Sequence, residues 1–172
     1  MRELVDAARV RRFMSATGRA ARDEGVCYFT GGATAVLIGW RGTTAYIDIK
    51  LEPEQDAVLR ALPALKEELR MNIELASPGD FVPLPSRWSE RSPLVAREGR
   101  LTFRHFDLYA QALSKLERSH TRDLEDVDAM IELRLVEPGR LREHFDEIRP
   151  ELYRFPAVDE TAFAANVEAV VG

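Results

Sequence analysis

Asp48 and Glu74 are the two acids of this chain whose surroundings suggest chemistry. Asp48 lies between two isoleucines, and an ionised carboxylate is costly to bury unless a cation or a hydrogen-bond donor accompanies it. Glu74 alternates with Ile73 and Leu75, which places its side chain opposite the expected core face of a strand. A buried Asp48 carboxylate is therefore expected to have a cation or a hydrogen-bond donor beside it. The competing interpretation is that both acids point to solvent from half-exposed strands.

A glycine pair precedes Asp48 in the chain. Gly31-Gly32 follows the apolar run Val26–Phe29 and comes just before a helix-like run from Ala33 to Trp40. Most glycine pairs mark simple turns, but few stand between a predicted strand and a predicted helix. The strand that carries Asp48 follows closely. The order of strand, glycine turn, helix and acidic strand indicates a composite site.

This layout resembles the signature of the nucleotidyltransferases of the DNA polymerase β superfamily. In that fold the backbone amides of the glycine turn meet a nucleoside triphosphate, and carboxylates of the following strand share Mg²⁺, or Mn²⁺ in its place. A nearby strand adds a carboxylate that binds the metal or deprotonates the acceptor hydroxyl. The resemblance thus implies catalytic and metal-binding roles for Asp48 and Glu74. The residues that it implies for nucleotide binding are Gly31, Gly32, Thr34 and Arg41.

One position departs from that pattern. The family's Asp-x-Asp stands here as Tyr46-Ile47-Asp48, so one of the two expected metal ligands on this strand is missing. A phenol is a neutral group and a poor ligand for Mg²⁺, which prefers charged oxygens. Two functions are therefore weighed: a magnesium-dependent enzyme, and a degenerate or inactivated domain that binds nucleotide, RNA or protein without chemistry.

A second stretch carries a more specific resemblance. Lys115-Leu-Glu-Arg118 followed by Arg122-Asp-Leu-Glu-Asp126 is similar to the Lys-Leu…Arg-Asp-x-x-Asp stretch of the AbiEii-type toxins of bacterial toxin–antitoxin systems, which belong to the same superfamily. This resemblance implies that Lys115 contacts nucleotide phosphate and takes part in catalysis, and that Asp123 or Asp126 assists in nucleotide binding. It also implies transfer of a nucleoside monophosphate from a nucleoside triphosphate to an acceptor hydroxyl, such as that of a tRNA or another RNA end. A cognate antitoxin protein is the further partner implied.

The same residues have a simpler interpretation. Leu113 and Leu116 are expected to pack inward while Lys115 projects from the adjoining helix face as a point charge. Asp123 and Asp126 are neighbours on one face of a helix, where acids near the first turn favour the helix dipole and pair with an arginine. Both interpretations stay open at the level of sequence.

Composition limits the classes of function. The chain has 172 residues, a formal net charge of -5 and one cysteine, Cys27. This charge argues against bulk electrostatic coating of nucleic acid, which needs clustered Lys and Arg, although a local basic face is compatible with the 24 basic residues. The lone cysteine fits a reducing compartment, and neither a leader nor a membrane span is expected. These features favour a cytoplasmic protein.

Hydrophobic periodicity gives the elements that must hold these residues. Strands are expected at Val26–Phe29, 44–51 and 72–76, with a hairpin around Glu98-Gly99. Helices are expected at 3–22, 33–40, 54–70 with an interruption at Pro63, 108–118, 123–133, 138–148 and 159–171. The caps expected are Gly25 at the end of the first helix, Asp107 before 108–118 and Thr121 before 123–133.

The order of these elements predicts an α+β fold. A small mixed sheet flanked by helices occupies residues 1–106, and residues 107–172 form a helical carboxy-terminal part of the same nucleotidyltransferase-like domain. The segment Ser77–Pro93 is rich in proline and serine and is a candidate lid or binding loop, in which Trp88 either packs the loop down or meets a base. His105 is expected either to be a surface or structural histidine or to touch substrate near Lys115.

Overall fold

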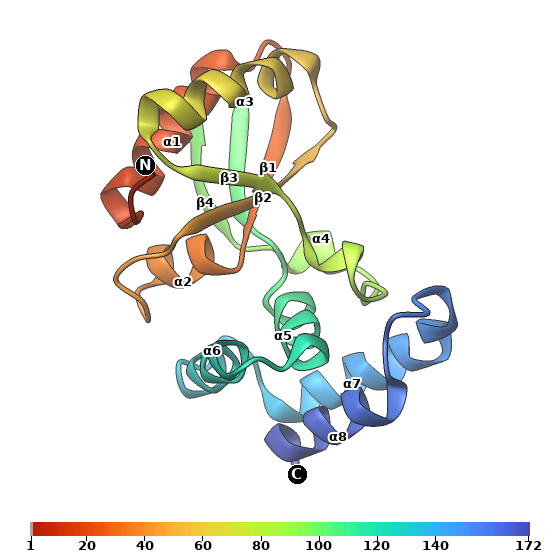
Figure 1. Ribbon diagram of the computed structural model, residues 1–172. Coiled ribbons are helices and arrows are strands. Elements are labelled where there is room, and N and C mark those ends of the chain that lie inside the picture. Colours follow the sequence, from red (N-terminus) through yellow and green to blue (C-terminus); the bar gives the residue numbers. More distant parts are fainter. Residues whose placement is uncertain (1) are drawn as a thin grey trace. The chain divides into compact units, whose positions relative to one another are not determined.

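The computed structural model describes residues 2–172, and the chain divides into two compact units. Unit 1 comprises the chain up to Ser77 together with Pro93–His105, and unit 2 comprises Pro78–Ser92 together with Phe106–Gly172. Figure 1 labels most of the helices and strands. Strands are confined to unit 1 among the described residues, and the change to an all-helical chain comes after His105, as the sequence predicts.

Unit 1 contains the sheet and three helices among its described residues. In chain order its elements are α1 (Ala7–Ala20), β1 (Gly25–Thr30), α2 (Gly32–Ile38), β2 (Tyr46–Glu52), α3 (Asp56–Leu69), β3 (Asn72–Leu75), β4 (Leu94–Glu98) and β5 (Leu101–His105). Each strand expected from the sequence is present, with bounds that differ by one or two residues.

The five strands form one mixed sheet in the order β3-β2-β1-β5-β4. β1 is antiparallel to β2 and parallel to β5, β2 is parallel to β3, and β4 and β5 form the expected antiparallel hairpin. The prediction of an α+β fold with a small mixed sheet is confirmed. β1 lies at the centre, so it brings residues of β2 and β5 to either side of its own.

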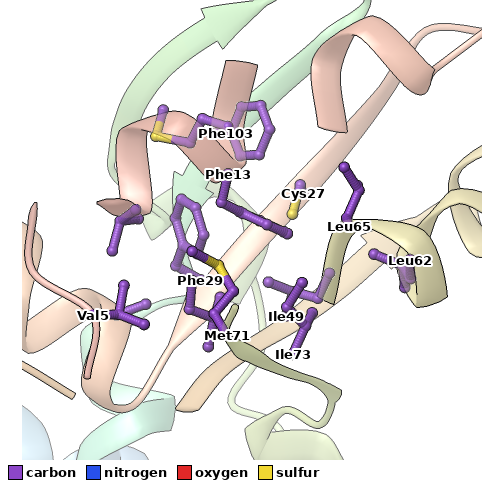
Figure 2. Packing of buried hydrophobic residues seen from close by; sticks show 14 of the residues in the cluster. Val5, Phe13, Cys27, Phe29, Ile49, Leu62, Leu65, Met71, Ile73 and Phe103 are labelled. Atoms are coloured by element: carbon purple, nitrogen blue, oxygen red, sulfur yellow. The ribbon is translucent and has the colours of Figure 1, made fainter. Parts of the chain in front are cut away.

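The core of unit 1 lies between the sheet and the helices α1 and α3 (Figure 1). Alternate strand residues enter it, and Cys27, Phe29, Ile49, Ile73 and Phe103 are buried together with side chains of both helices (Figure 2). Burial raises the pKa of the Cys27 thiol far above its ordinary value, so this cysteine is a core residue and not a nucleophile. The remaining strand residues face the other side of the sheet.

The first helix ends earlier than predicted, and Gly25 is not its cap. α1 stops at Ala20, Ala21 is extended, and Gly25 is the first residue of β1. The side-chain oxygen of Gln55 accepts hydrogen bonds from the backbone amides of Arg22 and Asp23 at 3.0 and 3.2 Å. This distant glutamine turns the chain, which a local pattern could not show.

Pro63 does not divide α3. The helix runs without a break from Asp56 to Leu69 with Pro63 inside it. Proline removes one amide donor, but Pro63 is exposed, while Val58, Leu62 and Leu65 on the other face are buried. Packing of that face keeps the helix continuous.

Unit 2 is helical. Its elements in chain order are η1 (Pro78–Asp80), α4 (Trp88–Arg91), α5 (Leu108–Arg118), α6 (Thr121–Glu132), α7 (Pro138–Ile148), η2 (Arg149–Arg154) and α8 (Glu160–Val171). Asp107 caps α5 as predicted, with its carboxylate accepting from the amide of Tyr109. The N-cap of α6 is His120 and not Thr121, because Asp123 accepts from the His120 amide and closes a capping box there.

The segment 78–92 is packed within unit 2. Trp88 stacks on the buried ring of Phe106, with ring centroids 4.3 Å apart and planes inclined by 4°. The Arg91 guanidinium donates to the Asp107 carboxylate at 2.8 Å and to the backbone oxygen of Ser86 at 2.8 Å. Of the two roles expected for Trp88, packing the loop down is the one observed.

Two glycines allow helix α1 to lie directly against the β4–β5 turn. A Cβ atom on Gly18 would lie 2.4 Å from the backbone oxygen of Glu98, and one on Gly99 would lie 2.5 Å from the backbone oxygen of Gly18. Gly99 also has a φ of +59°. Two backbones meet here at a distance that no other residue permits.

We predict that Gly18→Ala lowers the free energy of unfolding by about 1–3 kcal/mol, since overpacking against a backbone oxygen exceeds the gain in helix propensity. The matched control is Gly139→Ala on α7, where the nearest atom to an added Cβ is 3.8 Å away. The control should be neutral or stabilising. Denaturant unfolding of the three proteins measures the difference, and equal effects of both substitutions would contradict the close approach.

Candidate functional site

The turn after β1 requires both of its glycines. Gly31 has φ +60° and ψ −129°, a conformation that residues with a Cβ rarely adopt, and α2 begins at Gly32. A Cβ on Gly32 would lie 1.9 Å from the Thr44 hydroxyl, and one on Gly31 would lie 3.3 Å from Oδ2 of Asp48. The turn therefore lies directly against the Asp48 carboxylate.

Register brings the two predicted carboxylates together. Asp48 of β2 is paired with Glu74 of β3 in the parallel ladder and with Thr30 of β1 in the antiparallel ladder. Paired residues of neighbouring strands project to the same face, here the face opposite the buried Ile47 and Ile49. We call Thr30, Asp48 and Glu74 the carboxylate row. Like charges on adjacent strands repel each other, so a bound cation would stabilise the row.

The next position along this face of β2 and β3 has no acid. Tyr46 is paired with Asn72 of β3, and 48% of its surface is exposed. Among residues 2–172 no group of three or more His, Cys, Asp or Glu side chains is arranged to hold a metal ion. Mg²⁺ is often held by one or two carboxylates together with substrate phosphates, so two acids and the adjacent glycine turn fit it.

Hydrogen bonds of Thr34 and His105, both in unit 1, stabilise the glycine turn after β1. Thr34 Oγ1 donates to the backbone oxygen of Phe29 at 3.3 Å and lies 3.0 Å from Nδ1 of His105. With the hydroxyl proton directed at the carbonyl, Nδ1 carries the imidazole proton and donates to Thr34. Burial lowers the pKa of His105 to about 4, so the ring is neutral near pH 7. Of the two roles expected for His105, the structural one is observed.

Arg41 follows α2 and is half-buried. Its backbone amide donates to the Ala35 oxygen at 3.3 Å, which closes the end of the helix. This contact ties the start of the segment between α2 and β2 to the helix that follows Gly31.

Lys115, Asp123 and Asp126 form a buried charge cluster in unit 2. Lys115 Nζ lies 2.8 Å from Oδ2 of Asp126 and 3.8 Å from Oδ1 of Asp123, and at most 7% of each of these side chains is exposed. The expectation that Lys115 projects outward as a point charge is wrong, because α6 supplies two carboxylates that draw its ammonium group inward.

Asp123 also has the helix-start role considered above. Its carboxylate accepts from Nε of Arg118 at 2.8 Å and from the His120 amide at 3.2 Å. Burial acts to raise the pKa of Asp123, but the hydrogen bond and charge of Arg118, with the charge of Lys115, outweigh it and hold the pKa below its usual value. Asp126, by contrast, is the direct partner of Lys115.

The predicted site residues thus fall into two groups. Gly31, Gly32, Asp48 and Glu74 are brought together in unit 1, and the Lys115 cluster is assembled in unit 2. Sequence reasoning missed Thr30, which joins the carboxylate row. Thr30 has no local signal, since its position beside Asp48 follows from strand pairing.

The chain matches a known protein family over most of its length. Residues 14–157 match the profile of a family described as "Nucleotidyltransferase of unknown function (DUF6036)". No curated protein and no solved structure matches the chain. The matched range includes the glycine turn, both carboxylates and the Lys115 cluster. Within the described part of the chain, none of the helices combines the length and apolar character that a membrane crossing needs.

We predict that the buried imidazole of His105 makes the protein less stable in mild acid. Its pKa is about 4 in the folded protein and 6.5 when unperturbed, so the unfolded chain binds the extra proton first as pH falls below 6.5. The free energy of unfolding is unaffected by the titration of His105 above pH 6.5. It falls progressively between pH 6.5 and pH 4, by about 3 kcal/mol in all at ~1.4 kcal/mol per pH unit.

Unfolding measured between pH 4 and pH 7 tests this. His105→Gln, which cannot titrate, should show a flatter dependence of stability on pH than the natural protein, whatever its stability at pH 7. Parallel curves for the two proteins would contradict the assignment.

Proposed function

The chain belongs to the nucleotidyltransferase family whose profile covers residues 14–157, and we propose that it transfers a nucleoside monophosphate from a nucleoside triphosphate to an acceptor hydroxyl. The observation that supports this proposal is the register of Asp48 with Glu74 beside the Gly31 turn. Two acids and a backbone turn that only glycine fits are together the parts that positioning a triphosphate requires.

The reaction can be written from these parts. The acceptor oxygen forms a bond to the α-phosphorus, the bond from the α-phosphorus to the bridging oxygen breaks, and pyrophosphate leaves with that electron pair. Glu74 is exposed at the edge of the row, and the role proposed for it is to take the acceptor proton or to pass it to water. Asp48 and Glu74 would hold Mg²⁺ or Mn²⁺. The chemistry supplied by the cation, when bound, is neutralisation of charge on the triphosphate and the leaving pyrophosphate.

The acceptor we propose is an RNA end, such as that of a tRNA, and the biological role is that of a bacterial toxin controlled by a cognate antitoxin. The similarity of Lys115-Leu-Glu-Arg118 and Arg122-Asp-Leu-Glu-Asp126 to the AbiEii-type toxins supports this part. The observed contact of Lys115 with Asp126 also supports it, since the two residues of that motif meet. Growth arrest on expression in a bacterial host, relieved by a co-expressed antitoxin, is the corresponding test in cells.

A second function is favoured by Tyr46. A half-exposed phenol stands where the superfamily has a metal-binding acid, and its strand neighbour Asn72 is no acid either. A degenerate domain that binds nucleotide, RNA or a partner protein without chemistry would keep the glycine turn and need no complete metal site. The two functions predict different responses to substitution.

If the chain is an enzyme, Asp48→Asn should lower transfer of labelled nucleotide to RNA in Mg²⁺ by about 100-fold or more, because several kcal/mol of charge stabilisation is lost. Glu54→Gln, an exposed acid before α3, is the control and should leave the rate unchanged. All four nucleoside triphosphates are tried with total RNA as acceptor. Absence of transfer by the natural protein with every triphosphate would remove the enzyme proposal.

Restoring the missing acid separates the two functions. We predict that Tyr46→Asp tightens Mn²⁺ binding, measured by calorimetry, because an acid at i and one at i+2 share a strand face. A natural protein that is inert, with a variant that gains cation binding or transfer, identifies a degenerate site. A variant that binds no more cation than the natural protein shows that the metal site lies elsewhere.

A further inference from the structure

Next to the carboxylate row, the same face of the sheet carries two cations. Tyr28 of β1 is paired with Lys50 of β2 on one side and with Arg104 of β5 on the other. Residues two positions apart in a strand share a face, so Lys50 lies on the face of Asp48. We call Lys50, Tyr28 and Arg104 the cation row.

Lys50 takes part in a weak ion pair. It keeps 37% of its side chain exposed, and its partner Glu52 lies at 3.9 Å and is itself exposed. Arg104 is half-buried, and Tyr28 between the two cations is buried. Burial raises the pKa of the Tyr28 phenol, with Arg104 acting to lower it and Glu52 to raise it, so the phenol stays neutral. An exposed ion pair at such a distance contributes little, so Lys50 can exchange Glu52 for another anion.

The two rows and the glycine turn follow one another along the sheet. Gly31 comes directly after Thr30, whereas Tyr28 precedes Thr30 by two residues, or about 7 Å of strand. The carboxylate row therefore lies between the glycine turn and the cation row. A reacting phosphorus atom at the carboxylates would have the turn on one side and the cations on the other.

This order matters for the direction of attack. Phosphoryl transfer places the attacking oxygen and the leaving oxygen on opposite sides of the phosphorus atom. If the glycine turn holds the triphosphate, pyrophosphate leaves on the side of the turn. The acceptor then approaches from the side of the cation row.

Resting on the function proposed above, we propose that Lys50 and Arg104 bind phosphates of the single-stranded RNA end whose hydroxyl is the acceptor. Lysine and arginine contacts to phosphate position a nucleic acid without reading its sequence. With a net charge of -5, the chain has no general attraction for RNA, so a local pair of cations beside the acids is needed to bring in a polyanion.

Binding of a fluorescein-labelled single-stranded RNA, measured by anisotropy at several salt concentrations without nucleotide, tests the proposal. Removing both cations in Lys50→Ala/Arg104→Ala should weaken binding and reduce the slope of log affinity against log salt by about 1.4, at ~0.7 for each phosphate contact. Arg60→Ala removes a cation whose side chain is 84% exposed on α3, and as the control it should leave the slope unchanged. Arg104→Lys keeps the charge and should retain most of the slope, and thermal melting shows whether each variant is folded.

A parallel titration with each nucleoside triphosphate and Mg²⁺ separates the possible outcomes. Loss of triphosphate binding with unchanged RNA binding would show that the cations hold the nucleotide, which overturns the proposal. Absence of RNA binding by the natural protein, or an unchanged slope in the double variant, overturns it too. Loss of RNA binding as expected, in a protein that transfers no nucleotide, supports the subsite and rejects the transferase function alone.

Discussion

The strand register at the centre of the sheet is the constraint on which the candidate site depends. A shift of one residue between β2 and its neighbours would turn Asp48 into the core and bring Ile47 or Ile49 to the open face. The two isoleucines are fully buried, and Ile73 of β3 is 3% exposed, so burial of apolar surface opposes that shift. At roughly 1.5–3 kcal/mol for each such side chain, this burial outweighs the repulsion that aligning Asp48 with Glu74 entails. The hydrophobic core of unit 1 thus fixes the carboxylates in place.

The glycine turn depends on a second set of contacts within the same unit. Phe29 lies in the core and accepts from Thr34, and its strand partner His105 reaches the same hydroxyl. A neutral imidazole and a hydroxyl satisfy each other there without placing a charge beside Asp48. The turn is therefore held by buried polar contacts to two strands.

The parts of this structure that sequence could predict are local ones. Asp107 and the alternation around Asp48 follow from neighbours in the chain, and the structure has them as expected. Leu75, expected on the core face with Ile73, is instead 50% exposed, because it ends the edge strand β3. The end of α1 could not be predicted, because Gln55 determines it from far along the chain. The same holds for the pairing of Tyr28 with Lys50 and Arg104, and for the contact between Thr34 and His105. Both arise from β1 lying between β2 and β5, and nothing in a single strand specifies its neighbours.

The buried charges of the Lys115 cluster contribute little to the net stability of unit 2. Lys115 and Arg118 face Asp123 and Asp126, so the four charges cancel, and a buried ion pair is seldom more stabilising than apolar side chains of the same volume. Stability is therefore a weak reason for this arrangement.

A triphosphate that reaches Lys115 must take the place of the Asp126 carboxylate, which now lies 2.8 Å from the ammonium group. That exchange replaces one anion by another at the same cation, so its cost is far below that of uncovering a buried lysine, provided that Asp126 gains a new partner. A divalent cation brought in with the triphosphate is a partner of the required charge. A phosphate-binding role for Lys115 and its burial beside Asp126 are for this reason compatible.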